Sequence, residues 1–157
     1  YEIPLRLVGS EMCIETGHIQ RREKVNILID GTYFTNKVCL VLYRDCNIKM
    51  TILYRLTKGE ILRELKEDLR NIKSIGIRIE SVTCDGAAGI LRTVREVCPE
   101  AVLLRCTFHI AHEIQTWLTK KPKNDAAVEL LEIVRYLNRV ETNEDARLWT
   151  HSFIEWY

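Results

Sequence analysis

The chain has 157 residues, 46% of them hydrophobic and 29% charged, a composition typical of one soluble globular domain that buries a core and unlike that of a disordered segment. Its 23 lysines and arginines against 22 acidic residues give a formal net charge of +1, so any nucleic-acid contact must be local. No 18-residue apolar stretch or charged-then-apolar leader occurs, which excludes membrane spans and secretion signals. Six cysteines without C-x-x-C pairs indicate reduced thiols in a reducing, intracellular compartment.

Short apolar runs separated by polar turns follow a polar leading segment. We expect strands over 25–29, 38–43 and 48–55. Connections this short predict an antiparallel meander. The first residue is not Met, and Tyr157 ends an unfinished helical pattern, so we expect the chain to be an excerpt from a longer protein.

The spacing of apolar residues then becomes helical. It predicts a helix from about 61 to 72, a strand over 77–84, a second helix over 90–97 and a fifth strand over 101–106. Crossover helices make the fourth and fifth strands parallel to a neighbour. We therefore predict an α/β fold of the ribonuclease H-like (retroviral integrase-like) plan, a mixed five-stranded sheet flanked by helices.

Three further helices are expected after the fifth strand, so that the chain ends in an all-helical segment. Asn124 or Asp125 is the expected N-cap of the second of them, and Thr142 or Asn143 begins the third. The expected helices cover 108–118, 126–137 and 145–156. The expected parts of the chain are a leading segment over 1–24, a ribonuclease H-like core over 25–118 and the start of a helical insertion over 119–157.

Two aspartates directly follow apolar strands, and a glycine follows each aspartate. Asp30 comes after Val25–Ile29, and Asp85 comes after the strand predicted over 77–84. These strands are central neighbours in the predicted sheet, so their tips can converge although the aspartates are 55 residues apart. Mg²⁺ and Mn²⁺ prefer carboxylate oxygens, and two such ions can clamp the attacking and leaving oxygens in phosphoryl chemistry. We predict that Asp30 and Asp85 bind Mg²⁺ or Mn²⁺.

A simpler interpretation exists for each aspartate, since a lone Asp-Gly pair is common in turns. Asp85 precedes the predicted helix start at Ala87 and Ala88, so we expect it to cap that helix even if it also binds metal.

A Cys-x-x-His segment follows the fifth strand. Cys106 and His109 would need two more ligands to bind zinc, and Cys84 is the only other candidate near the same sheet edge. The preferred interpretation is that His109, at a strand-to-helix turn, forms a hydrogen bond with a catalytic carboxylate or a phosphate oxygen. A plain structural role for Cys106 as a small buried group is an equally good alternative.

Three of these motifs together resemble the catalytic domain of bacterial insertion-sequence transposases of the Mutator-like group. The motifs are Ile-Asp-Gly-Thr-Tyr-Phe at 29–34, Thr-Cys-Asp-Gly at 83–86 and Cys-Thr-Phe-His at 106–109. The resemblance covers roughly residues 25–118. It implies a ribonuclease H-like core with an Asp, Asp, Glu (DDE) catalytic triad, in which Asp30 is the first acid, Asp85 the second, and Cys106 with His109 the accessory motif.

The third acid that the resemblance implies has no match in this chain. The glutamates after the accessory motif lie in helical patterns typical of a solvated face: they include Glu129, Glu132, Glu141, Glu144 and Glu155. We therefore expect the third ligand to be absent and the isolated chain to be nearly inactive, because two carboxylates hold a second metal ion poorly.

Two further clusters have both a functional and a structural interpretation. Lys120, Lys121 and Lys123 can contact DNA phosphates, although a loop between helices is as often lysine-rich for solubility. Trp149, Phe153 and Trp156 form a stripe on the last predicted helix. Such a stripe is more often core than a base-stacking platform, and here it can pack on missing parts of the protein or on a second copy.

The sequence thus predicts a DNA transposase that performs metal-dependent strand cleavage and strand transfer on double-stranded DNA, both transposon ends and target. Such a protein would be a homo-oligomer at full length and would lie in the bacterial cytoplasm with the nucleoid. A ribonuclease H-like nuclease or junction resolvase is the first alternative, distinguished by hydrolysis without strand joining. An inactive transposase-derived DNA-binding module is the second.

Overall fold

The computed structural model describes residues 24–35, 38–58 and 62–157. The leading segment predicted over 1–24 lies, except for Lys24, outside the described residues, as does Cys13. The chain divides into two compact units, residues 1–104 and 105–157. The first holds the sheet, and the second is helical. This division falls before the helix at 107–118, whereas the predicted core extended to residue 118.

Five strands form one mixed sheet, as predicted, in the order β3-β2-β1-β4-β5. β1 pairs antiparallel with β2, β2 pairs antiparallel with β3, and β1 pairs parallel with β4. The first and fourth strands are therefore neighbours in the middle of the sheet. The strands are β1 (Lys24–Thr35), β2 (Val38–Asp45), β3 (Met50–Thr57), β4 (Arg78–Cys84) and β5 (Val102–Arg105).

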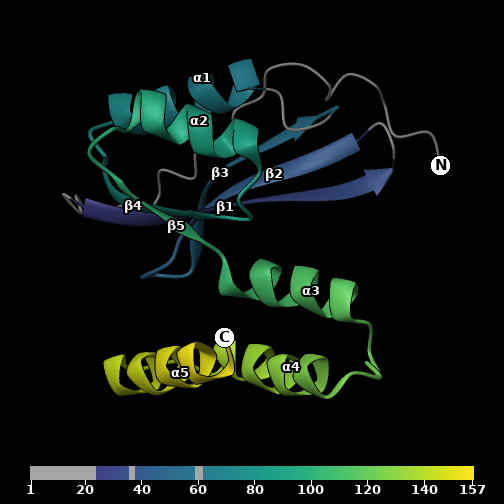
Figure 1. Ribbon diagram of the computed structural model, residues 1–157. Coiled ribbons are helices and arrows are strands. Elements are labelled where there is room, and N and C mark those ends of the chain that lie inside the picture. Colours follow the sequence, from purple (N-terminus) through teal and green to yellow (C-terminus); the bar gives the residue numbers. More distant parts are fainter. Residues whose placement is uncertain (1–23, 36–37, 59–61) are drawn as a thin grey trace. The chain divides into compact units, whose positions relative to one another are not determined.

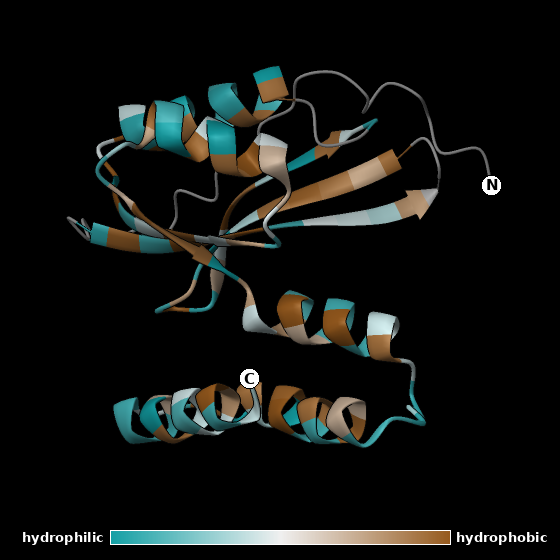
Figure 2. Ribbon diagram, in the orientation of Figure 1, coloured by the Kyte–Doolittle hydropathy of each residue, from teal (hydrophilic) through white to brown (hydrophobic). Residues whose placement is uncertain are grey.

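Two helices, α1 (Leu62–Ser74) and α2 (Ala88–Val97), lie side by side on one face of the sheet (Figure 1). Buried residues from both helices and from β1 to β4 form one apolar core. Alternate residues of β1 supply its centre, because side chains of a strand point to opposite faces in turn. Figure 2 shows hydrophobic and hydrophilic residues alternating along the same two helices, as amphipathic helices require. The central β1 residues of the core are Val25, Ile27 and Ile29.

A buried polar group fastens α1 to the sheet. Asp68 is 1% exposed and accepts hydrogen bonds from the Arg55 guanidinium of β3 and, at 2.9 Å, from the Tyr43 hydroxyl of β2. Burial, and then the charge of Asp68, raise the pKa of Tyr43 far above its ordinary value, which keeps the phenol a donor. If such a carboxylate lost its partners, the unpaired buried charge would strongly destabilise the fold.

The second unit contains three consecutive helices, α3 (Thr107–Leu118), α4 (Asp125–Leu137) and α5 (Asn143–Trp156). Two predicted caps are confirmed. Asn124 Oδ1 accepts a hydrogen bond from the Ala126 amide. Thr142 and Asp145 form a reciprocal capping box, in which each side chain accepts from the other's backbone N–H.

The aromatic stripe of α5 packs within this unit. The Trp149 indole N–H donates to the Ile133 carbonyl oxygen of α4 at 2.8 Å, and the Trp156 indole donates to that of Ala126 at 2.8 Å. Phe153 stacks between the two tryptophans. The stripe thus packs against α4, in keeping with the interpretation as core, and its three side chains remain partly exposed; packing on a second copy or on missing parts of the protein stays a prediction.

Candidate functional site

Asp30 lies inside β1, not at its end as predicted. β1 continues to Thr35 because β2 pairs with it that far, and Asp30 is the register partner of Leu42. Pairing with β4, however, ends at Leu28 and Thr83. Asp30 therefore stands two residues past the last β1–β4 pair, where β1 still has β2 on its other side.

Asp85 stands at the matching position, one residue past the end of β4. It follows Thr83 by two residues, just as Asp30 follows Leu28. Its Oδ1 accepts a hydrogen bond from the Ala87 amide at 2.8 Å, and Gly86 takes a φ of 95°, which glycine adopts without strain. Ala87, not Asp85, is the N-cap of α2 and has no side-chain cap. The predicted capping role is thus replaced by a tight turn that orients the carboxylate ahead of the helix.

Asp30 lies on the sheet face opposite to α1 and α2, and Asp85 directly follows a strand that has residues on the same face. Ile27 and Ile29 are buried beneath the helices, so strand alternation directs Leu28 and Asp30 to the other face. Thr83 is the partner of Leu28 and shares its face, and Asp85 follows Thr83 by two residues, one residue past the end of β4. Neighbouring strands lie about 4.8 Å apart, a separation at which two carboxylates can share metal ions.

The donor set suits a hard cation but is incomplete. Carboxylate oxygens are the ligands that Mg²⁺ and Mn²⁺ prefer, and both aspartates are only partly exposed. Among the described residues, no group of three or more His, Cys, Asp or Glu side chains is arranged to hold a metal ion. The described part of the chain therefore offers two carboxylates as candidate ligands, and no third acid is grouped with them.

An apolar groove of about 610 Å³ adjoins Asp30 on the same sheet. Asp30, Leu42 and Tyr54 are successive register partners across β1, β2 and β3, and the latter two line the groove together with Phe34, Leu40 and Leu56. Phe34 is 62% exposed. Sequence reasoning missed this groove, although the alternation of leucines with buried residues in β2 is a signal for a second apolar face.

Cys106 and His109 belong to the helical unit. Cys106 is the N-cap of α3, without a side-chain cap hydrogen bond, and is half-buried. The His109 ring packs edge-on against Phe108, with ring centroids 5.7 Å apart. Phe108 in turn stacks on His112. The hydrogen bond from His109 to a catalytic carboxylate or a phosphate oxygen stays a prediction.

Cys84 is unsuited to the zinc alternative. It is 1% exposed and belongs to the apolar core of the sheet unit, since alternation in β4 points it toward the helices together with Val82. The five cysteines in the described ranges are all free thiols.

Lys120, Lys121 and Lys123 lie in the turn between α3 and α4, and all three are exposed. Thr119 begins this turn with a φ of 66°, an uncommon conformation for a residue that is not glycine. Within the part of the chain that the structure covers, none of the three lysines forms an ion pair. The turn is therefore available to an anionic partner.

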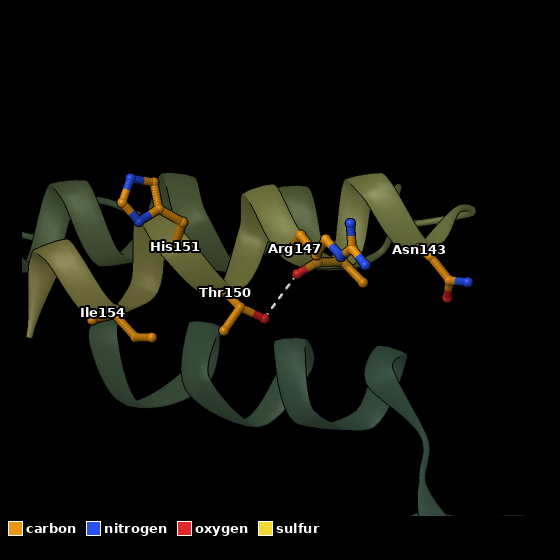
Figure 3. Close-up of a pocket in the computed structure, with 6 residues that line it drawn as sticks. Asn143, Arg147, Thr150, His151 and Ile154 are labelled. Atoms are coloured by element: carbon orange, nitrogen blue, oxygen red, sulfur yellow. Dashed lines mark hydrogen bonds between the residues drawn. The ribbon is translucent and has the colours of Figure 1, made fainter.

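A second groove, of about 570 Å³, runs along α5 (Figure 3). Three of its polar side chains are engaged within their own helix. The Thr150 hydroxyl donates to the Ala146 carbonyl oxygen, Arg147 pairs with Glu144, and His151 pairs with Glu155. The groove thus has no cluster of uncompensated charge to recruit an anion.

The profile of the family described as "Transposase, Mutator family" matches residues 50–157, more than half of the chain. The match includes Asp85, Cys106 and His109 and begins after Asp30. No curated protein matches the sequence. No helix in the described ranges is both long and apolar enough to cross a bilayer.

The chain also matches a chain of one solved structure, titled "CryoEM structure of simian T-cell lymphotropic virus intasome in complex with PP2A regulatory subunit B56 gamma". The matched chain is 15% identical, with a TM-score of 0.38, and the alignment covers 88% of this chain. This chain spans 58% of the length of that one. A similarity of this extent carries no argument about function.

Proposed function

This chain belongs to the Mutator family of transposases, and we propose that it carries the metal-binding half of a DDE-type catalytic centre on a ribonuclease H-like core. The observation that carries the proposal is the register of β1 and β4. Asp30 and Asp85 each stand two residues past the last paired residues of adjacent parallel strands. The strand order with a parallel β1–β4 pair at its centre supports the ribonuclease H-like assignment.

In this proposal the aspartates hold Mg²⁺ or Mn²⁺ through their carboxylate oxygens. The bound ions would activate water or a 3′-hydroxyl for attack on a phosphodiester and stabilise the leaving oxygen. The Ala87 N–H fixes Asp85 through its Oδ1, and the pairing of Asp30 with Leu42 fixes the backbone of the other ligand. Rigid ligands on strands favour a defined ion position.

The activity that follows is DNA strand cleavage and strand transfer by the whole protein, with transposon ends and target DNA as substrates and a homo-oligomer as the working form. A third acid would complete the site from another segment of the protein. The open apolar face beside Asp30 is suited to seat such a segment. The Lys120–Lys123 turn would contact the DNA backbone, since lysines gain affinity by releasing counterions.

The metal site can be tested on this chain by Mn²⁺ titration, followed by the relaxation of water protons. We expect Asp30→Asn and Asp85→Asn each to weaken Mn²⁺ binding at least about tenfold, because each removes one of two ligands. Asp125→Asn, at the start of α4, is the matched control and should leave binding unchanged. Equal Mn²⁺ affinity in Asp30→Asn and the unsubstituted chain would refute the proposal.

Catalysis supplies the second test. With two of three acids present, the chain should nick or join plasmid DNA very slowly in Mg²⁺ or Mn²⁺. Robust, Asp30-dependent turnover would show that a third acid is not required. Hydrolysis without joining by the full-length protein would favour a nuclease or resolvase instead.

A further inference from the structure

The charges of α1 are sorted onto two sides of the helix. Its acidic residues turn toward β3: Asp68 and Glu67 both pair with Arg55, and Glu64 accepts a hydrogen bond from Thr57. Residues 64, 67 and 68 share one side of a helix by their spacing. The acidic side of α1 is therefore engaged by the edge strand and does not neutralise the rest of the surface.

The basic residues of α1 occupy the other side. Arg63, Lys66 and Arg70 recur at intervals of three and four residues, which places them in one row. Lys66 reaches across to Glu96 of α2 at 2.6 Å. Arg63 and Arg70 are exposed.

α2 continues this basic surface. Arg92 and Arg95 are exposed, and Glu96 is the acidic residue between them and α1. The hydrogen bond from Lys66, and then the charges of Lys66, Arg70 and Arg92, lower the pKa of Glu96. Three cations from two helices thus act on one carboxylate, which is partly exposed and offsets the charge of only one of them.

The cations remain in excess on this surface. Among the residues that the structure describes, Arg63, Arg70, Arg92 and Arg95 form no ion pair. The chain as a whole has a net charge of only +1, so this accumulation is a local feature. Ordinary soluble surfaces intersperse both signs.

We propose that the outer surface of α1 and α2, formed by Arg63, Lys66, Arg70, Arg92 and Arg95, binds the phosphate backbone of duplex DNA. The inference rests on the proposed function, which makes DNA the substrate. Arginine suits this role because its guanidinium donates two parallel hydrogen bonds to one phosphate. Unpaired cations also give affinity through counterion release.

The DNA segment bound by the surface of α1 and α2 differs from the DNA segment that would be bound at the metal site. α1 and α2 cover one face of the sheet, whereas Asp30 lies on the opposite face. The sheet itself separates the two surfaces (Figure 1). A protein that cleaves one DNA and joins it to another needs to hold two duplexes, and this surface supplies a second contact without using the carboxylates.

The test is the salt dependence of binding to a fluorescent 30-base-pair duplex of arbitrary sequence, measured by anisotropy in EDTA so that no metal contributes. We expect the triple variant Arg70→Ala, Arg92→Ala, Arg95→Ala to lower affinity about 10- to 100-fold near 0.1 M salt. The slope of the logarithm of the association constant against the logarithm of the salt concentration should become shallower by about 2 to 3, roughly one for each phosphate that the variant no longer neutralises. Circular dichroism confirms that the variant is folded.

The matched control is Arg135→Ala, Arg139→Ala, Arg147→Ala in the helical unit, which removes the same charge and should change the slope much less. Equal losses in both variants, or no binding by the unsubstituted chain, would refute the proposal. Preferential binding of polyglutamate over DNA would assign the surface to an acidic protein instead. Because the assay contains EDTA, its outcome does not depend on metal held by Asp30 and Asp85, so this test stands apart from that of the metal site.

Discussion

The sheet unit and the helical unit are stabilised by different means. The sheet unit buries a continuous apolar core from four strands and two helices and encloses Asp68 with its partners. In the helical unit the buried residues are Ala111, Leu131 and Val134, and α5 has none among its described residues. Caps and indole hydrogen bonds to α4 carry much of its local order.

This difference teaches where each unit is vulnerable. Deep burial makes the sheet unit sensitive to removal of one buried partner, because the remaining buried polar groups then lose a hydrogen bond that water replaces poorly. The helical unit depends on solvent-exposed interactions of smaller individual strength, so its amides should exchange with solvent through lower-energy openings.

The largest expected effect comes from Asp68→Ala. The substitution leaves Arg55 and the Tyr43 hydroxyl without their buried acceptor, which should lower the free energy of unfolding of the sheet unit by about 3–5 kcal/mol. Chemical denaturation, with hydrogen exchange read separately on β1 and α5 peptides, measures the change. Exchange in α5 should be affected less than exchange in β1.

Glu67→Ala is the control for that substitution, because Glu67 contacts the same Arg55 from the same helix at 3.4 Å and is largely exposed. A surface ion pair contributes about 0–1 kcal/mol. Similar losses of stability for the two variants would show that burial does not distinguish the two carboxylates.

A smaller effect is expected from Thr142→Ala in the helical unit. The substitution removes the hydroxyl that accepts a hydrogen bond from the Asp145 amide at 3.1 Å. Loss of an N-cap lowers the free energy of unfolding by about 1 kcal/mol. Exchange at the start of α5 should accelerate while β1 is unchanged. Thr150→Ala, in the middle of the same helix, should have little effect; a comparable destabilisation there would contradict a specific capping role.

The smallest expected effect is a pH dependence confined to α5. Hydrogen bonds from the Thr142 side chain and backbone, and from the Glu141 amide, lower the pKa of Asp145 below its ordinary value of 3.8. A lowered folded-state pKa gives stability that is present above about pH 4 and is lost as the pH falls through the lowered value. Asp145→Asn should abolish this acid-dependent part.

Thermal melts between pH 5 and pH 2 measure that dependence, with Asp125→Asn as the control for removal of one carboxylate from a helix start. If Asp145→Asn left the pH dependence of the melting temperature unchanged, the capping box would not contribute to the acid-sensitive stability of the helical unit.

Local sequence patterns were enough to predict the helices and strands and much of their order. The spacing of apolar residues, every two residues in strands and about every 3.6 in helices, is a local pattern, so it predicted the five strands and the helices. Polar residues before the helices predicted the caps at Asn124 and Thr142. The pairing of β1 with β4 was also predictable, because a crossover helix forces strands to run parallel. Asp30 and Asp85 could therefore be assigned to neighbouring strands.

Contacts between distant segments, by contrast, set which faces these residues occupy and what covers them. β1 runs beyond Asp30 because β2 pairs with it, Cys84 enters the core, and the α5 tryptophans pack on α4. The segregation of α1 charges likewise depends on Arg55, which is distant in sequence. The physical reason is that spacing fixes the period of an element, whereas its register, burial and charge partners arise from contacts between segments far apart in the chain.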